Sequence, residues 1–360
     1  MWQYFLKRIL LFIPTLIVIT TISFGVSRLA PGDPVAAKIG QGAEGGVSGR
    51  STLNEKTAEL LRQQWHLDKP TWQQYLIWMG GYLCFDLSKV FTPSGSDWSA
   101  AVFTGKPDFG KSFQDNRPVF EKMLERVPVT LTMNLIAILL AYLVAVPLGI
   151  YSATHPGTFV DRISTFVLFA LYSLPVFWIG TLAITFLSNP EFLAIFPSSG
   201  LRSPSFSVHW SFWKKFGDYA WHLALPMLVY VYADFAFISR QMRSSMLEVI
   251  RQDFVRTARA KGLAERTVVY RHALRNALIP LITLVAALIP NLIGGSVIIE
   301  SIFSIPGMGE LSFKGLVARD YPMIMAVFTI SAVLTLVGML VADMLYAIAD
   351  PRISYSRKAS

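Results

Sequence analysis

A chain of 360 residues that is 53% hydrophobic and only 15% charged, with a mean hydropathy of +0.47, is too apolar for an ordinary soluble domain of this length. A lipid bilayer is the expected solvent. The net charge of +9 could indicate a nucleic acid partner, but the basic residues flank apolar runs, which favours lipid head groups and a cytoplasmic protein partner. The single cysteine, Cys84, excludes an intramolecular disulfide.

Six runs of the sequence are apolar and long enough to cross a bilayer. A helix that rises ~1.5 Å per residue needs about 20 residues to span a hydrocarbon layer ~30 Å thick, and its backbone groups must pair internally. The first run follows Lys7 and Arg8 like a signal peptide, but it lacks a small-residue cleavage pattern, which predicts a retained helix. The sequence therefore predicts an all-α membrane protein with six transmembrane helices, at 9–27, 129–153, 163–187, 219–239, 278–299 and 323–348.

About a hundred residues separate the first two runs, far more than a short connection between helices needs. This length predicts a large extracytoplasmic insertion, with a start rich in Gly and Ser at 40–51. The predicted organisation is an N-terminal segment with the first helix at 1–29, an extracytoplasmic subdomain at 30–128, a core of the second to sixth helices at 129–348 and a C-terminal tail at 349–360.

One segment of the insertion matches a nucleotide-binding pattern by its letters alone. Residues 105–112, GKPDFGKS, satisfy the phosphate-loop formula G-x-x-x-x-G-K-[ST]. A phosphate loop needs a preceding strand, a following helix whose amides meet the phosphates, and cytosolic nucleotide. Pro107 interrupts the loop, and no apolar strand flanks it. We therefore expect no nucleotide site here.

The charges of the connecting segments predict an orientation. Segment 240–277 carries nine Lys and Arg against three acids, whereas 30–128 is balanced at eleven of each. Loops rich in Lys and Arg stay in the cytoplasm, so 240–277 is predicted to lie inside. Six spans then place both termini in the cytoplasm, consistent with basic residues near each end.

Part of this inner segment has the spacing of a helix. An apolar face over 247–262 is formed by residues at i, i+3, i+7 and i+11: Leu247, Ile250, Phe254 and Ala258. Gly262 is a suitable helix stop, and the small residues at 258 and 260 would allow close approach to another protein. The pattern leaves open a helix that docks on a protein and one that rests on lipid head groups.

The segment 256–262, RTARAKG, followed by RHALRNAL at 271–278, resembles the loop that permease subunits of ABC importers insert into their ATPase subunits. These two motifs have the residues typical of the dipeptide/oligopeptide, binding-protein-dependent family. The broader family begins this loop with Glu-Ala-Ala, where this chain has Arg256, Thr257 and Ala258. Likeness to the first, B-type permease of the peptide branch continues at 30–34, 108–112, 126–131, 300–309, 319–322 and 350–353.

This resemblance implies a division of labour among subunits. It implies a second homologous permease, two ATPase subunits that bind ATP and Mg²⁺, and an extracytoplasmic solute-binding protein, so that this chain holds no cofactor and hydrolyses nothing. It implies a multi-pass protein of the bacterial inner membrane. Related systems carry dipeptides, oligopeptides, modified peptides or nickel, and 213–222 is similar to the subgroup for longer or modified peptides. The implied coupling helix contains Arg256, Thr257, Ala258, Arg259, Ala260, Lys261 and Gly262.

Polar residues inside predicted spans are expensive in lipid and therefore mark candidate functional positions. Asp343, near the inner end of the last span, could equally bond across helices, as could the asparagines. The five histidines are isolated, with no pair at i, i+4, so no metal site is expected. The candidates for the translocation pathway are Asn134, Asp234, Asn291 and Glu300.

Two alternatives belong to other functional classes. An intramembrane enzyme could use Asp234 and Asp343 as an acid pair, but these residues lie in different spans at different depths. An ion-coupled secondary carrier would usually show two inverted halves with broken helices, and the sequence has no evident internal repeat. The basic inner loop favours the ABC permease.

Overall fold

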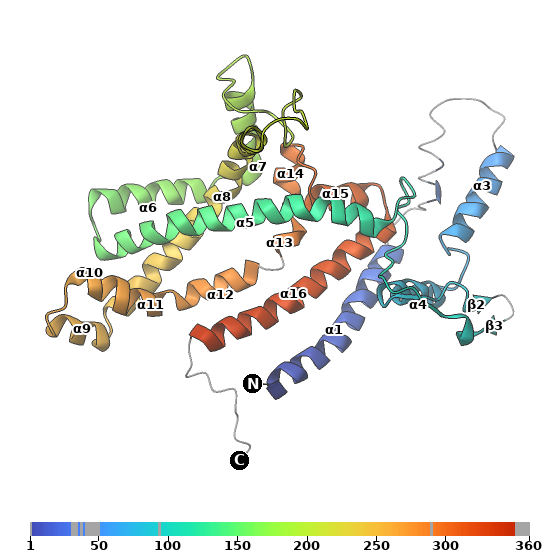
Figure 1. Ribbon diagram of the computed structural model, residues 1–360, viewed down its shortest axis with the longest axis horizontal. Coiled ribbons are helices and arrows are strands. Elements are labelled where there is room, and N and C mark those ends of the chain that lie inside the picture. Colours follow the sequence, from blue (N-terminus) through green and yellow to red (C-terminus); the bar gives the residue numbers. More distant parts are fainter. Residues whose placement is uncertain are drawn as a thin grey trace. The chain divides into compact units, whose positions relative to one another are not determined.

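The computed structural model describes residues 2–29, 35, 36, 39, 51–92, 95–288 and 291–349, and they form mostly helices (Figure 1). The prediction of a mainly helical protein is confirmed. The chain divides into two compact units. Unit 1 comprises Met1–Arg8, Pro128–Glu310 and Leu334–Ser360, and unit 2 comprises Ile9–Val127 and Leu311–Val333.

Four helices of the described chain are long and apolar enough to cross a membrane: α1 Trp2–Leu29, α5 Val119–Thr154, α8 Phe212–Ile250 and α16 Tyr321–Ala349. Many apolar side chains of α1 and α5 are exposed, as on Leu10 and Leu139 (57% and 66%), which suits contact with lipid, whereas α8 is mostly buried. They contain the first, second, fourth and sixth predicted spans. α5 and α8 continue beyond the predicted limits.

The third predicted span, 163–187, is not one straight helix. It consists of α6 Phe159–Tyr172 and α7 Val176–Ala183, which continues into the π-helical turn η2 Ile184–Ser188, and the two parts meet at 95°. The bend occurs where Pro175 precedes α7, because proline supplies no N–H and disfavours a helical residue before it. If this bent pair is one span, the described residues contain five.

The fifth predicted span, 278–299, is wrong as a single helix. The structure has three short pieces instead: α12 Ile279–Leu288, α13 Asn291–Gly294 and α14 Val297–Ile302. Gly295 separates the last two with a φ of +70°, a conformation that favours glycine, and Ser296 caps α14 by accepting a hydrogen bond from the Ile299 N–H. α15 Met308–Val317 follows.

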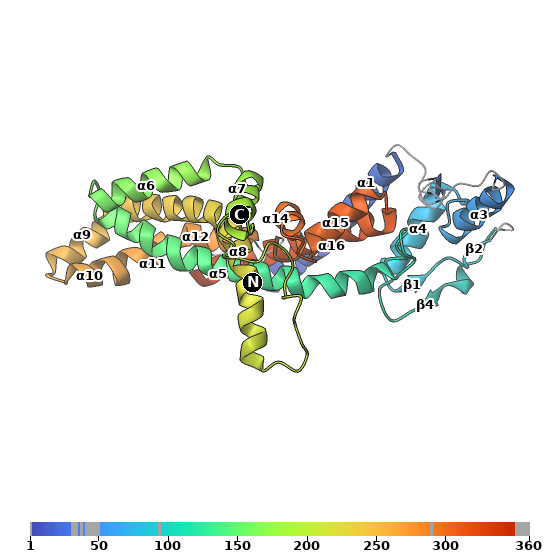
Figure 2. The ribbon, with the colours of Figure 1, turned by 90° about the horizontal axis from the view of Figure 1, so that it is seen from above.

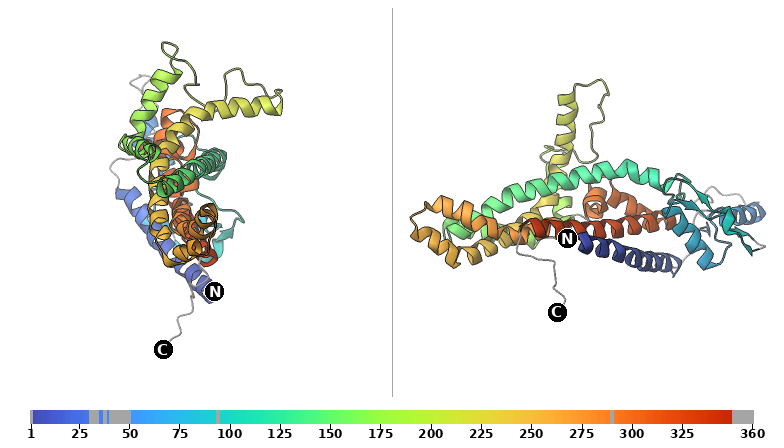
Figure 3. Two further views of the ribbon diagram at one scale, coloured as in Figure 1. Left: turned by 90° about the vertical axis from the view of Figure 1, so that its left-hand side faces the viewer. Right: turned by 60° about the horizontal axis from the view of Figure 1, so that its bottom comes forward.

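The core of unit 1 uses small residues where its long helices meet. Ala137, Ala141 and Ala145 recur every fourth residue of α5 and are buried in the same cluster as Met242 and Met246 of α8. Small side chains let helices approach closely in a membrane, where packing rather than hydrophobicity drives association. α6 packs on α8, while the first turns of α8 and the preceding loop extend from the rest of the unit (Figure 2 and Figure 3).

Unit 2 contains the described part of the predicted extracytoplasmic insertion. Its elements are α3 Ser51–Gln64, α4 Thr71–Tyr82, the short 3₁₀ helix η1 Trp98–Ala100 and two antiparallel ribbons. The ribbons pair β1 Phe85–Asp86 with β4 Val102–Phe103, and β2 Phe91–Thr92 with β3 Gly95–Ser96. An aromatic cluster around Phe24, Phe113 and Tyr321 forms the core.

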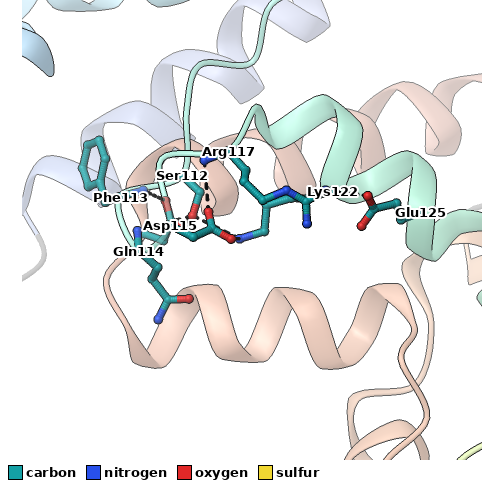
Figure 4. Close-up of polar contacts among 8 residues, drawn as sticks. Ser112, Phe113, Gln114, Asp115, Arg117, Lys122 and Glu125 are labelled. Carbon is teal, nitrogen blue, oxygen red and sulfur yellow. Dashed lines mark hydrogen bonds and ion pairs between the residues drawn. The ribbon is translucent and has the colours of Figure 1, made fainter.

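A buried carboxylate joins two segments of unit 2 that are far apart in sequence. Asp320, which is 1% exposed and precedes α16, accepts hydrogen bonds from the Ser112 hydroxyl (2.5 Å) and the Phe113 N–H (3.0 Å). Lys122 lies 3.1 Å from the Ser112 hydroxyl and 2.9 Å from Asp115 (Figure 4). The loop that matched the phosphate-loop letters therefore ends in a bridge to α16, and no helix begins at its Ser112.

Candidate functional site

The loop of unit 1 that was predicted to be cytoplasmic forms a short helix, α9 Asp253–Ala260, at one end of the unit (Figure 1). The predicted helix over 247–262 is wrong in its continuity, because α8 ends at Ile250 and the chain turns before α9 begins. That break changes the helical phase. Val255 and Ala258 are buried (0% and 5%), whereas Phe254 is 39% exposed.

The exposed surface of α9 consequently combines the aromatic ring of Phe254 with basic and small side chains. Its buried side faces a cluster that includes Val268 and Ala273 of the π-helical turn η3 Val268–Ala273, which lies between α10 Glu265–Thr267 and α11 Leu274–Ala277. Ala258 of the predicted coupling set therefore belongs to the inner side. The members of that set exposed to solvent are Arg256, Thr257, Arg259, Ala260, Lys261 and Gly262.

The turn after α9 is closed by a two-point ion pair. Arg259 donates from Nε (3.1 Å) and Nη2 (2.6 Å) to the two carboxylate oxygens of Glu265. The hydrogen bonds from Arg259 lower the pKa of Glu265, and the same contact raises the pKa of Arg259. Gly262 turns the chain with a φ of +74°, and no atom lies within 4 Å of where a Cβ would stand. The ion pair thus fixes the turn, while the space around Gly262 is free of other atoms of the described chain.

A second feature of unit 1 is a cavity of about 290 Å³ lined by residues of the predicted spans. Asn134 is 6% exposed, accepts a hydrogen bond from the Tyr230 hydroxyl (2.5 Å) and donates one to the Leu292 carbonyl (3.0 Å). Asp234 lies one helical turn after Tyr230 on α8 and also lines the cavity. Among the described residues, none donates a hydrogen bond to the Asp234 carboxylate or forms an ion pair with it.

Glu300 has a different environment. It is 1% exposed, and its carboxylate accepts hydrogen bonds from the Glu310 N–H (2.8 Å), the Ser296 N–H (3.3 Å) and the Thr130 hydroxyl (3.1 Å). Thr130 in turn accepts from the Met308 N–H (2.8 Å). The Glu300 carboxylate therefore ties the segment 295–310 to the beginning of the membrane part of α5.

The other candidate polar residues are not brought into these sites by the described contacts. Asn291 belongs to α13, but its side chain lies outside the described residues. Asp343 forms an ion pair with Arg8 and is not among the residues that line the cavity with Asp234. The acid pair imagined for an intramembrane enzyme is therefore not assembled at that cavity. Over the part of the chain that is described, no three His, Cys, Asp or Glu side chains gather as a metal site.

Sequence reasoning missed the residues that support these side chains. Tyr230 holds the Asn134 amide, and its position one turn before Asp234 was a signal that could have marked the same helix face. Thr130 bridges Glu300 and Met308, although the sequence alone assigned it no role. Val255 replaces Phe254 on the inner face of α9, which depends on a break that residue spacing does not reveal.

Comparison with known proteins covers nearly the whole chain. Residues 145–355 match the family described as binding-protein-dependent transport system inner membrane component, and residues 1–134 match the N-terminal model of such membrane components. The oligopeptide transport system permease protein AppB of Bacillus subtilis is 37% identical over 358 residues, which cover 99% of this chain and 100% of AppB.

Two further relatives have similar coverage. The dipeptide transport system permease protein DppB of Escherichia coli is 33% identical, and the peptidoglycan transport system permease protein YejB of Agrobacterium fabrum is 32% identical, each over 99% of this chain and 100% of its own length. A solved structure of the MetNI methionine ABC transporter, in an inward-facing conformation, has 18% identity and a TM-score of 0.48, over 64% of this chain and 97% of its own.

The family models and the full-length permease relatives favour a transport subunit over the intramembrane enzyme and the secondary carrier, and subunits of this family partner with ATPase and other permease subunits. The apolar helices place the chain within the membrane, consistent with the family description. The full-length identity and the family models together show that this chain belongs to the binding-protein-dependent transport system inner membrane components and is an ABC transporter permease subunit, an integral inner-membrane transport component that is not itself an enzyme.

Proposed function

We propose that this chain imports peptides or peptide-like solutes across the inner membrane as one of two homologous permeases, coupled to two ATPase subunits and supplied by an extracytoplasmic solute-binding protein. The observation that carries the proposal is the full-length identity of 32–37% with permeases named for oligopeptide, dipeptide and peptidoglycan transport. ATP and Mg²⁺ are bound by the ATPase partners. The chain crosses the membrane six times, with the third span bent and the fifth broken, and both termini are cytoplasmic.

α9 is the proposed coupling helix. Its inner side chains, Val255 and Ala258, are buried in the core of unit 1, while Phe254 and the basic groups of Arg256 and Lys261 are exposed. A partly exposed aromatic ring beside positive charges suits a cleft that is apolar at its floor and acidic at its rim. Because the Arg259–Glu265 pair holds the turn, movement of the ATPase would be transmitted to α8 and η3 rather than absorbed locally.

The proposed translocation pathway passes the cavity of Asn134 and Asp234. A carboxylate without a described partner, placed on a long apolar helix, is costly unless a solute, water or another subunit reaches it. Glu300 contributes by holding the segment 295–310 in place, and Asn291 remains a candidate on the adjoining short helix. Movement of the bundle between two packings would then open the pathway to each side in turn.

Purification from the native membrane in mild detergent, followed by ATPase and uptake measurements in proteoliposomes, tests this proposal. We expect two ATPase subunits and a second permease to co-purify, and ATP-driven uptake of a labelled peptide to require the binding protein. Replacement of Phe254 and Arg256 by Glu should reduce ATPase co-purification, whereas Lys89→Glu, an exposed charge reversal in unit 2, should not. A lone protein without ATPase subunits would contradict the assignment of α9.

A further inference from the structure

Unit 2 contains a cavity of about 590 Å³ that the transport proposal does not use. It is lined by the end of α1, by α4, by the loop at 108–113 and by the beginning of α16, and it is partly open. Its walls are strongly aromatic, and the rings of Trp65 and Phe113 stack with their centroids 3.8 Å apart. A cavity of this size with aromatic walls and a few polar groups has the character of a ligand site.

The distinctive polar group of this cavity is Arg28, in the last turn of α1. Its guanidinium lies over the rings of Phe24 (5.1 Å) and Tyr321 (6.0 Å), and its buried Nε has no hydrogen-bond acceptor among the described residues. The rings stabilise the positive charge, but they do not accept its N–H groups, which form a planar fork suited to a phosphate or carboxylate. Arg28 is thus oriented by its neighbours, and no carboxylate of the described residues pairs with it.

The other charged groups of the cavity do not supply that anion. Asp86 accepts hydrogen bonds from the Ser88 hydroxyl (2.6 Å) and N–H (2.9 Å), and Asp108 accepts one from the Gly110 N–H (2.8 Å). Burial lowers the pKa of His66, which keeps this ring neutral near pH 7, and Lys111 is exposed. Both acids therefore accept hydrogen bonds within their own loops, and neither pairs with Arg28 among the contacts of the described residues.

A second unpaired atom of the cavity is an acceptor. Gln74 donates from Nε2 to the Lys69 carbonyl (2.6 Å), which orients the amide, while its buried Oε1 accepts no hydrogen bond from the described residues. A ligand that satisfies both residues carries an oxyanion for Arg28 and a hydroxyl or ammonium donor for Gln74. The phosphate of phosphatidylglycerol or phosphatidylethanolamine has such a donor beside it, whereas the quaternary ammonium of phosphatidylcholine has no N–H or O–H.

The position of Arg28 along α1 indicates where this ligand comes from. It lies one residue before the end of the apolar span Arg8–Leu29, at the depth where a spanning helix meets lipid phosphates. Earlier in α1, towards the middle of the span, Ile22 and Val26 are 60% and 58% exposed and form an apolar surface that acyl chains can cover. We propose that this cavity binds the phosphate of a phospholipid, with phosphatidylglycerol and phosphatidylethanolamine preferred over phosphatidylcholine. With both termini in the cytoplasm, as proposed above, this phospholipid belongs to the outer leaflet; no other part of the inference depends on that orientation.

Native mass spectrometry of the whole transporter complex tests this site. The complex is purified in maltoside detergent, delipidated and titrated separately with short-chain phosphatidylglycerol, phosphatidylethanolamine, phosphatidylcholine, inorganic phosphate and a labelled peptide. We expect one phosphatidylglycerol per chain, and we expect Arg28→Gln to weaken its binding about tenfold or more, because charge-assisted hydrogen bonds are lost. Gln74→Leu should remove the preference over phosphatidylcholine while leaving binding dependent on Arg28.

Two controls separate the site from general effects. Arg117→Gln removes another Arg of unit 2, one already paired with Glu125 at 2.5 Å, and should leave phospholipid binding unchanged. Circular dichroism of each variant checks folding, and Arg28→Lys, which keeps the charge, should bind more tightly than Arg28→Gln. Equal phosphatidylglycerol binding by Arg28→Gln and wild type would overturn the proposal. Displacement of the lipid by the peptide, or binding of inorganic phosphate alone, would overturn the lipid assignment. Peptide uptake is not needed for any of these readings.

Discussion

Two carboxylates of unit 1, Glu300 and Asp234, show how one type of side chain serves different purposes in adjoining parts of a permease. Glu300 is 1% exposed and accepts hydrogen bonds from two backbone N–H groups and a hydroxyl. Asp234 lines a cavity and receives no hydrogen bond from a described residue. A buried polar group whose bonds are all made locally stabilises the fold, whereas one left without partners is available to a ligand or another subunit.

The largest effect should come from Glu300→Ala. The change removes the acceptor of the Ser296 and Glu310 N–H groups, which are partly buried. We expect it to cost about 3–5 kcal/mol in total, because each donor left without a partner costs about 1–3 kcal/mol. Thermal unfolding of the purified complex in detergent measures it. The matched control is Glu248→Ala on the exposed side of α8, which should unfold like the wild type. Equal stability of the two variants would show that the hydrogen bonds of Glu300 contribute no more to folding than an exposed acid does.

A smaller loss of stability should follow from crowding the same carboxylate. A Cβ at Gly307 would lie 2.4 Å from the Glu300 carboxylate, so Gly307→Ala should cost about 1–3 kcal/mol through overpacking. Gly217→Ala, in α8, has nothing within 4 Å of the added carbon and should be neutral or slightly stabilising, because alanine favours a helix. Comparison of the two unfolding temperatures checks the prediction. A neutral Gly307→Ala would show that the segment 295–310 is less tightly held than its contacts indicate.

For Asp234 we expect the opposite division between stability and function. Asp234→Asn removes no described contact, so the unfolding temperature should not fall, but ATP-driven uptake should drop about tenfold, equivalent to ~1.4 kcal/mol, because the cavity loses its carboxyl group. Uptake and ATPase activity are measured together in proteoliposomes, with Asp234→Glu as the variant that keeps the carboxyl group. Normal uptake by Asp234→Asn would remove this residue from the proposed pathway.

The smallest effect concerns the pH dependence of the turn after α9. The pKa of Glu265 is lowered by its hydrogen bonds from Arg259, so its contribution is present above the unfolded pKa, about 4.3, and is lost as the pH falls through the folded value. Because the pair is exposed, we expect less than about 1 kcal/mol. The protection factors for hydrogen exchange at 261–264, which compare the observed with the intrinsic rate at each pH, should fall towards low pH in the wild type but not in Glu265→Gln. Identical profiles would mean that the pair does not hold the turn.

The candidate site residues were predicted from local signals. The RTARAKG segment at 256–262 and the positive charge around it pointed to the loop at 240–277, and Asp234 stood out as an acid within an apolar run. The hydrogen-bond partners of the candidate residues could not be predicted from the sequence. The partners of Asn134 lie 96 and 158 residues away along the chain, at Tyr230 and Leu292, and no spacing rule connects positions so distant.

The sequence by itself determined that this chain lies in a membrane, where its principal helices are and to which family it belongs, since apolar content and motif residues add up along consecutive positions. Only the tertiary structure decided that the third span bends by 95°, that the fifth is broken into short helices and that Val255 rather than Phe254 faces inward. It also showed that the Glu300 carboxylate is hydrogen-bonded within the described chain, whereas that of Asp234 accepts no hydrogen bond from a described residue. The physical reason is that a carboxylate is satisfied by whichever N–H groups the folded chain brings to it, and Glu300 meets those of Ser296 and Glu310 only once Gly295 has turned the backbone.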